Sequence, residues 1–121
     1  MFRYFNVMNP KITNNKEPLE LLGDDALVLA SECLRVMGHP TRIRIVEVLL
    51  QGEFTVGEVA RICRLPAHQT TGHLRLMKNA GLLNSKRSGR SVYYSISDPR
   101  LPGLINCIRT NCQCNKQNQE I

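Results

Sequence analysis

Three of the five cysteines lie within eight residues near the C-terminal end of the chain, at Cys107, Cys112 and Cys114. Deprotonated thiols are soft ligands that select soft metal ions. As(III) and Sb(III) suit three sulfurs because a lone pair occupies the fourth direction, and mercury, cadmium and zinc also bind thiolates. The spacing therefore predicts an inorganic ion at these thiols, with As(III) or Sb(III) favoured, and no organic cofactor.

The spacing of these thiols also limits how a single ion could be held. On an unbroken helix Cys107 and Cys114 share a face but lie ~10 Å apart along the axis, and Cys112 points elsewhere. Either the helix ends near Asn111 and the tail folds back, or the three sulfurs come from two subunits. A redox role also stays open, since oxidation would form a disulfide from Cys107 to Cys112 or Cys114.

The other two cysteines have a structural interpretation. Cys33 and Cys63 both lie on apolar helical stripes, and free cysteine is among the most buried residue types. We expect both side chains in the core, with Cys33 as a candidate fourth ligand. Cys112 also lies on an apolar stripe, so a structural role competes there.

The charge of the chain points to a second kind of chemistry. The 121 residues carry 16 Lys and Arg against 10 Asp and Glu, and the resulting net charge of +6 suits a polyanionic partner. No secretory signal or membrane-spanning run is apparent. We therefore expect a cytoplasmic protein without a membrane partner, whose cysteines stay reduced. The length fits one domain with a small core, for which dimerisation is a natural remedy.

Thr55 to Gly81 predicts two short helices joined by a tight turn. Thr55 and Glu58 have the spacing of a capping box at the first helix, and Pro66 suits the first position of the second. Gly81 supplies the left-handed residue that commonly ends a helix. Because successive residues of a helix are rotated by about 100°, the second helix has an inward face and an opposite, outward face that is polar and basic. The inward face holds Thr70, His73, Leu74 and Met77, and the outward face holds His68, Thr71, Gly72, Arg75 and Lys78.

Periodicity places three further helices around this pair. The first starts at the cap residue Asp24 and stops before His39, because a residue preceding proline leaves the helical region. Pro40 starts a second helix that is apolar nearly all round, as expected of a central core helix. The last runs at helical spacing from Leu101 through Cys112.

The first and last helices both carry apolar faces that so small a core cannot cover, so we expect them to pack against a second copy. On the first helix this face holds Ala26, Leu29, Ala30, Cys33 and Met37, widened by Leu27 and Leu34. The expected organisation is a flexible arm over residues 1–18, one domain over 19–114 and a polar tail over 115–121.

Between Gly81 and the last helix the chain alternates with period two and predicts a β-hairpin. Val92, Tyr94 and Ile96 alternate with polar neighbours. The tip, over residues 86–90, combines a Ser-Gly turn signal with three cations. We interpret it as a cationic wing, against the plainer reading of a solvated charge cluster.

Together these segments resemble the ArsR/SmtB family of winged-helix repressors. The resemblance lies in VMGHPTRIRIVEVLLQGEFTVGEVARICRLPAHQTTGHLRLMKNAGLL followed by GRSVYYSISDP. It implies a mainly α fold, a winged helix-turn-helix with a small β-hairpin wing, and a cytoplasmic homodimer through the first and last helices. Members of this family sit on operator DNA until an inducer, often a metal or metalloid, lowers their affinity.

Physical docking rules then assign the DNA contacts. A recognition helix enters the major groove with its N-terminal residues on base edges, and cations farther along meet phosphates. Arg is favoured in the minor groove, where a wing would reach. The candidates are His68, Gln69 and Thr71 for bases or phosphates, Arg75 and Lys78 for phosphates, and Arg87 and Arg90 for the wing. His73 is expected to be a hydrogen-bonded core residue.

The inducer sites implied by the resemblance are largely missing. The family's vicinal cysteines at the start of the third helix are replaced by Thr55 and Gly57. Of its fifth-helix zinc site Asp98 survives, whereas a cationic Arg100 cannot be a ligand. The thiol-persulfide branch has a cysteine where this chain has Glu47.

These observations lead to one functional hypothesis and two rivals. We expect a repressor that leaves double-stranded operator DNA when its C-terminal thiols capture As(III) or Sb(III). The rivals are a thiol-redox repressor of the same fold and a winged-helix module that binds protein without specific DNA binding. An enzyme is not expected, because the sequence has no recognisable nucleophile arrangement and no Gly-rich phosphate loop.

Overall fold

The computed structural model describes residues 18–112, which form five helices and a three-stranded sheet. In chain order these elements are α2 (Asp24–Met37), α3 (Pro40–Leu49), β1 (Phe54–Thr55), α4 (Val56–Cys63), α5 (Ala67–Asn79), β2 (Leu83–Ser88), β3 (Ser91–Ile96) and α6 (Leu101–Asn111). The winged helix-turn-helix expected from the sequence is confirmed. The predicted arm, apart from Pro18, the predicted tail and Cys114 lie outside the described residues.

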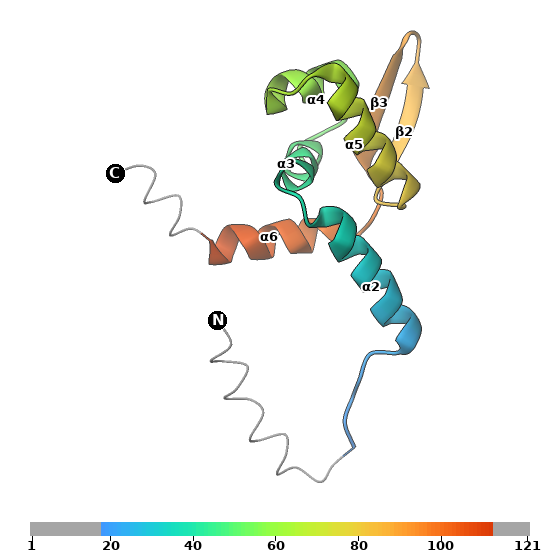
Figure 1. Cartoon of the computed structure of the whole chain (residues 1–121), viewed down its shortest axis with the longest axis vertical. Coiled ribbons are helices and arrows are strands. Elements are labelled where there is room, and N and C mark those ends of the chain that lie inside the picture. The colour runs from blue at the N-terminus through green and yellow to red at the C-terminus, as the bar shows by residue number, and fades with distance from the viewer. Residues whose placement is uncertain (1–17, 113–121) are drawn as a thin grey trace, which may run out of the picture.

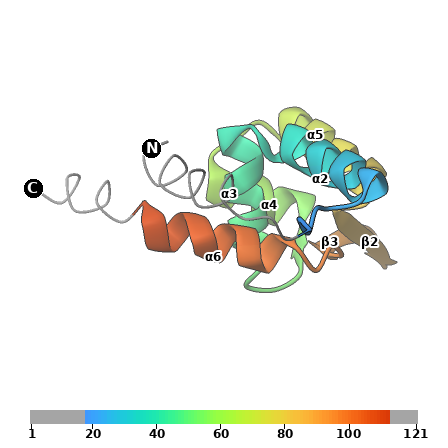
Figure 2. The same ribbon diagram turned by 90° about the horizontal axis from the view of Figure 1, so that it is seen from below.

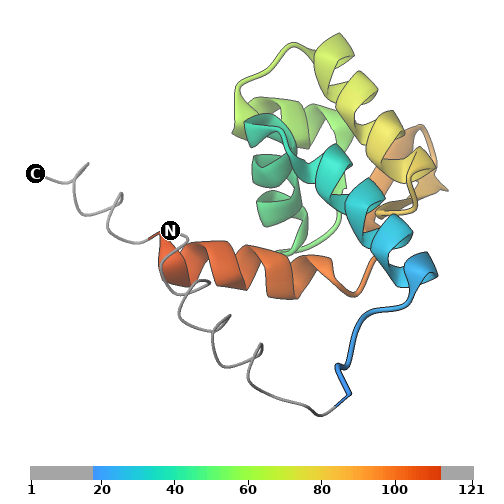
Figure 3. The same cartoon turned by 60° about the horizontal axis from the view of Figure 1, so that its bottom comes forward.

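Helix α3 is the centre of the core, as its nearly continuous apolar surface predicts. Ile45 and Val46 are fully buried, and α3 contacts α2, α4, α6 and β3. Figure 1 shows α3 between α4 and α6, and in Figure 3 α6 runs across the base of α3. His39 caps α3, because its Nδ1 accepts the N–H of Thr41 at 3.1 Å.

The helix starts at Pro40 and after Thr55 agree with the sequence, whereas those of α2 and α5 differ from the prediction by one residue. The capping box is confirmed: Thr55 Oγ1 accepts the N–H of Glu58 at 3.2 Å, and Glu58 accepts the N–H of Thr55 at 2.9 Å. Asp24 was expected to cap α2, but Gly23 holds that position. Pro66 is likewise the N-cap of α5 and not its first helical residue, because its ψ of 145° is extended and its carbonyl accepts the first helical N–H.

The sheet has one strand more than the sequence predicted. The hairpin of β2 and β3 is confirmed, with register from Leu83 opposite Ile96 to Ser88 opposite Ser91. On its other side β3 pairs with β1, which has only two residues and is too short to show any alternation. Gly89 turns the hairpin at φ 63°, a left-handed conformation that favours glycine.

Helices α2 and α6 lie at the end of the molecule opposite the hairpin tip in Figure 1, and seen from that end, in Figure 2, they run along different sides of it. In α6, Leu101 and Ile105 are buried. In α2 only the C-terminal turns are buried, at Cys33, Val36 and Met37. Of the rest of the predicted apolar face of α2, Ala30 is half-buried, and the residues exposed in the single chain are Ala26, Leu27, Leu29 and Leu34. None of the helices within residues 18–112 combines the length and apolarity needed to cross a membrane.

Candidate functional site

Helix α5 has a fixed orientation because its inner face is buried. Thr70, Leu74 and Met77 are all fully buried, and α5 packs against α4 and β2. Thr70 Oγ1 also donates to the carbonyl of Pro66 at 3.1 Å, inside its own first turn. The opposite face is therefore presented outward with a defined rotation about the helix axis.

That outer face carries the predicted recognition residues. His68, Gln69, Arg75 and Lys78 are exposed, as predicted. Thr71 is half-buried, so it lies at the edge of this face and not at its middle. His68, Gln69 and Thr71 belong to the N-terminal turns of α5, whereas Lys78 lies in its last turn. We call this surface, with Thr71 at its edge, the recognition face.

His73 is a partly buried, hydrogen-bonded residue on the inner side of α5, as expected. Its Nδ1 accepts from Nε of Arg42 at 3.3 Å, and its ring meets that of His39 edge to face, with centroids 5.0 Å apart. Burial, followed by the charges of Arg42 and His39, lowers the pKa of His73 below its ordinary value of 6.5. The neutral ring is therefore the form that packs at this junction of α3 and α5.

The hairpin tip presents the predicted cations of the wing. Arg87 lies opposite Val92 in the register, and both Arg87 and Arg90 are exposed. Lys86 Nζ lies 3.9 Å from Glu53 Oε1, a loose and exposed pair. Arg87 and Arg90 have no carboxylate partner within residues 18–112. Their charges are thus available to an external anion.

The thiols of α6 are exposed where α6 ends. Cys107 and Cys112 are both exposed, and α6 ends at Asn111, with Cys112 leaving the helical path at φ −116° and ψ 22°. Asn111 Nδ2 donates to the carbonyl of Cys107 at 2.8 Å and lies 3.5 Å from its Sγ. The described part of the chain holds no group of three His, Cys, Asp or Glu that could bind a metal, and Cys114 lies beyond it. Two exposed thiols can bind a soft ion, but only together with at least one further ligand.

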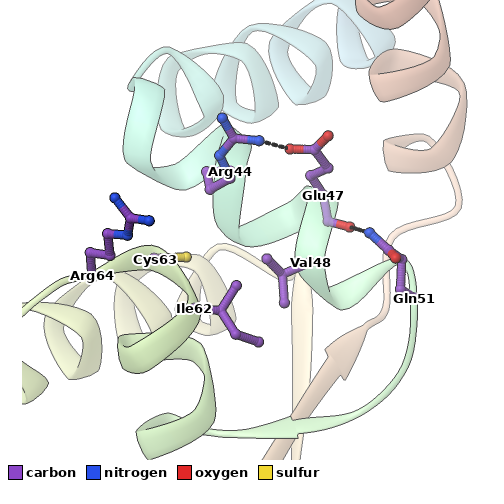
Figure 4. Close-up of a pocket in the computed structure, with 7 residues that line it drawn as sticks. All are labelled: Arg44, Glu47, Val48, Gln51, Ile62, Cys63 and Arg64. Carbon is purple, nitrogen blue, oxygen red and sulfur yellow. Dashed lines mark hydrogen bonds and ion pairs between the residues drawn. The ribbon is translucent and has the colours of Figure 1, made fainter.

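Cys33 and Cys63 differ from each other in exposure. Cys33 is buried, as predicted, and burial is the main cause that raises the pKa of its thiol. Cys63 is only half-buried, although burial also raises the pKa of its thiol. Its sulfur lines a cleft between α3 and α4 (Figure 4). The expectation of a core residue is therefore confirmed for Cys33 and only partly correct for Cys63.

Asp98 is already occupied by a cationic partner. Its carboxylate accepts from the backbone N–H of Arg100 at 2.8 Å, from Nε at 3.0 Å and from Nη2 at 2.5 Å. The side-chain hydrogen bond from Arg100 is the main cause that lowers the pKa of Asp98. Nη1 of Arg100 reaches the carbonyl of Leu29 on α2 at 3.4 Å. Asp98 thus orients Arg100, which joins the start of α6 to α2. Because its carboxylate oxygens already accept hydrogen bonds from Arg100, Asp98 is poorly suited to bind a metal.

Glu47 connects α3 to α6. One carboxylate oxygen forms an ion pair with Arg44, and the other accepts from Nη2 of Arg109 on α6 at 3.3 Å. No pattern in the sequence indicates either the contact of Glu47 with Arg109 or the cleft beside it. Both depend on residues that come together only when α3, α4 and α6 pack.

The comparisons with known proteins agree with this geometry. A family model described as a helix-turn-helix domain matches residues 37–86. The transcriptional repressor PagR of Bacillus anthracis is 34% identical over 88 residues, which cover 72% of this chain and 83% of PagR. The CadC homolog of Staphylococcus aureus, a cadmium resistance transcriptional regulatory protein, is 34% identical over 76 residues, covering 62% of this chain and 63% of that relative. The chain therefore spans less than two thirds of the CadC homolog.

A solved structure gives the same result for the fold. HlyU from Vibrio cholerae N16961 matches with a TM-score of 0.69 at 26% identity, over 75% of this chain and 100% of that chain.

Proposed function

The chain belongs to the ArsR/SmtB family of winged helix-turn-helix transcriptional regulators, and from that premise we propose that it is a DNA-binding repressor. Its relatives are transcriptional regulators and not enzymes. The observation that carries the proposal is the recognition face of α5, which is exposed, polar and basic on a helix whose other side is fully buried. The two unpaired wing cations support it.

Each part of this surface has a role in the proposed complex. His68, Gln69 and Thr71, in the first turns of α5, would meet base edges or nearby phosphates in the major groove. Arg75 and Lys78 would hold phosphates farther along. The wing residues Arg87 and Arg90 would enter the minor groove or hold its phosphates. Base contacts then select the sequence, and phosphate contacts set the position.

We further infer a homodimer that uses α2 and α6. Leu27, Val28, Leu29 and Leu34 of α2 are between 50% and 61% exposed in the single chain. Burying such side chains between two copies is favourable by about 25 cal/mol per Å² of apolar area. Two recognition helices in a two-fold dimer would then meet half-sites about one DNA turn apart.

Binding to promoter fragments tests the DNA part of the proposal. We expect tight binding to one fragment over random DNA of equal length, and a steep loss of affinity as salt rises. Gln69→Ala should weaken the preference, because Gln69 is assigned to bases, whereas Arg75→Ala should weaken binding to all fragments alike. Arg35→Ala, which removes an exposed cation of α2 outside the recognition face and wing, is the matched control and should bind normally. Equal binding to all fragments would reject a specific repressor.

For the sensing step we propose a soft thiophilic ion, with As(III) or Sb(III) favoured and cadmium, mercury and zinc as alternatives. The donors would be Cys107, Cys112 and Cys114, whose three thiolates match the pyramidal preference of As(III). The end of α6 at Asn111 supports a set in which the chain folds back, since Cys112 has already left the helix. The name of the cadmium resistance relative supports a soft ion in general and not arsenic in particular.

Release from DNA would follow from movement of α6. Its start contacts α2 through Arg100 and Leu29, and its later turns contact α3 through Arg109 and Glu47. Drawing the C-terminal thiols together would shift α6 against α2 at the inferred dimer interface. The two recognition helices would then lose the spacing that the half-sites require.

Titration of each ion into operator-bound protein tests the sensing step. We expect As(III) or Sb(III) to release the DNA, and the change of Cys107, Cys112 and Cys114 together to Ser to abolish release while leaving DNA affinity intact. Cys63→Ser is the matched control and should respond normally. Unchanged DNA affinity with all three thiols reduced would reject these ions as inducers.

A thiol-redox switch is the second candidate, because Cys107 and Cys112 are both exposed and close in sequence. Peroxide would then release the DNA in the absence of any metal, and a reductant would restore binding. Chelator-treated protein separates the two mechanisms, since only the redox switch responds under that condition.

A further inference from the structure

A cleft of about 500 Å³ separates α3 from α4, and none of its lining residues belongs to the recognition face, the wing or the thiols of α6. Helix α3 contributes Arg44, Glu47 and Val48, and the turn that follows it contributes Gln51. Helix α4 contributes Ile62, Cys63 and its C-terminal cap Arg64 (Figure 4). A volume of this size lies within the range of about 300–1,000 Å³ that is usual for small-molecule sites.

The polar side of the cleft is positively charged. Arg44 forms an ion pair with Glu47, but that carboxylate is shared with Arg109, which bonds its other oxygen at 3.3 Å. Arg64 has no carboxylate partner among residues 18–112. Two guanidinium groups, Arg44 and Arg64, therefore line the cleft with one carboxylate, Glu47, which Arg109 of α6 already shares. The excess favours an anionic ligand.

The remaining wall of the cleft is apolar. Val48 is buried beneath it, and Ile62 is 47% exposed, which leaves a large aliphatic side chain facing solvent. Figure 4 shows Ile62 and Val48 lying between Arg64 on one side and Glu47 on the other. A ligand that combines an anionic group with a short aliphatic segment would cover this surface.

The backbone at Arg64 adds an independent observation. Arg64 has φ 59° and ψ 51°, and it is the one residue other than glycine with positive φ in the described part of the chain. This left-handed conformation is uncommon for a residue with a side chain. Its N–H is held by the carbonyls of Ala60 and Arg61, so the backbone is fixed at the point from which the side chain lines the cleft. A left-handed residue commonly ends a helix, but its usual occupant is glycine and here it is arginine.

We propose that this cleft binds a small organic anion, a carboxylate joined to a short aliphatic segment. Arg44 and Arg64 would hold the carboxylate through charge-assisted hydrogen bonds, and the aliphatic part would cover Val48 and Ile62. Because α4 is the first helix of the helix-turn-helix pair, the ligand would tie that pair to the central helix α3. Binding itself does not depend on the proposed DNA function, whereas any effect on operator affinity does.

Titration of the free protein with hexanoate, followed by amide NMR, tests the proposal. We expect saturable shifts at Val48, Ile62 and Cys63, with a Kd on the order of 1 mM. Hexanamide, which lacks the charge, should bind at least about tenfold more weakly. Failure of hexanoate to shift these amides, or equal affinity for hexanamide, would overturn the proposal.

Two variants of neighbouring arginines make the test specific. Arg64→Gly keeps the left-handed backbone, since glycine adopts it freely, and should weaken hexanoate binding about tenfold in a protein that remains folded. Arg61→Gln removes an exposed cation from the same helix outside the cleft and should bind hexanoate as the wild type does. Equal affinity in Arg64→Gly and wild type would also overturn the proposal.

A final arm separates this site from the proposed DNA function. Operator affinity is measured with and without hexanoate in the wild type and in Arg64→Gly. Protein that binds hexanoate but never binds DNA contradicts only the repressor proposal, whereas protein that binds DNA but shows no hexanoate shifts contradicts only the cleft proposal.

Discussion

The guanidinium of Arg42 donates from Nε to Nδ1 of His73 at 3.3 Å, across 31 residues of sequence. The same side chain donates from Nη1 to the carbonyl of Val36 at 3.1 Å. One arginine therefore joins the end of α2, the start of α3 and the inner side of α5. Because α5 carries the recognition face, the protonation state of His73 bears on how that face is held.

The stability of the protein should fall as pH is lowered below about 6.5, the ordinary pKa of histidine. The folded state lowers the pKa of His73, so the unfolded state binds more protons in this range. The contribution of the neutral ring is complete above 6.5 and is lost as pH falls through the lower folded pKa. Urea unfolding at several pH values measures this slope.

His73→Gln should flatten that slope, because an amide can accept from Arg42 without titrating. His68→Gln is the matched control, since His68 is exposed on the same helix, and should retain the wild-type slope. Equal slopes in wild type and His73→Gln would show that His73 is not the responsible group.

Arg64→Gly should be more stable than Arg64→Ala by about 1 kcal/mol, the usual cost of the left-handed conformation for a residue with a Cβ. Both variants lose the side chain, so the comparison isolates the backbone at φ 59°. Arg61→Gly, within the helical part of α4, should instead lose about 1 kcal/mol. Chemical denaturation measures all three, and greater stability of the alanine variant would contradict the prediction.

Arg87→Ala and Arg90→Ala should each lower the salt dependence of operator binding by about one unit in the slope of log affinity against log salt. The reason is that neither side chain has an internal carboxylate partner within residues 18–112, so each charge is free to neutralise a phosphate. Both variants should keep the unfolding free energy within about 0.5 kcal/mol. Arg35→Ala should leave the slope unchanged, and a wing variant with an unchanged slope would place that arginine away from the DNA.

Asp98→Asn should lower the unfolding free energy by about 2 kcal/mol at neutral pH, since it weakens three hydrogen bonds with Arg100, two of them to a charged group. The lowered pKa of Asp98 means that its contribution is complete above the ordinary value of 3.8 and is lost as pH falls through the folded pKa. The variant should therefore show a flatter acid limb. Asp25→Asn, on an exposed part of α2, should change stability by at most about 0.5 kcal/mol.

Much of the fold was predictable because its signals are local. The capping box of Thr55 and Glu58, the turn at Gly89 and the buried face of α5 each depend on residues a few positions apart. The errors at Asp24 and Pro66 are also local, because each is a shift of one residue. Asp24 was expected to be the N-cap of α2 and is its first helical residue, and Pro66 was expected to be the first helical residue of α5 and is its N-cap. A pattern of residue types places a helix more securely than it places its first residue.

The candidate site residues also differ in whether a local pattern predicts their exposure. Exposure of His68, Gln69, Arg75 and Lys78 follows from helical periodicity once the inner face is known. The half-burial of Cys63 does not, because a stripe of apolar residues has edges, and packing against α3 decides how far an edge residue is covered. The pairing of Asp98 with Arg100 shows a similar limit, since side-chain geometry decides it.

The sequence by itself determined the order of the helices, the hairpin, the recognition face and the cationic wing, because periodicity, caps and turn residues act over short stretches of chain. Only the tertiary structure decided that β1 joins β3, that Glu47 of α3 pairs with Arg109 of α6, and that α3 and α4 leave a cleft between them. These features depend on the distances between side chains that are far apart in sequence. Such distances are set by how the helices pack, and no local pattern of residues encodes them.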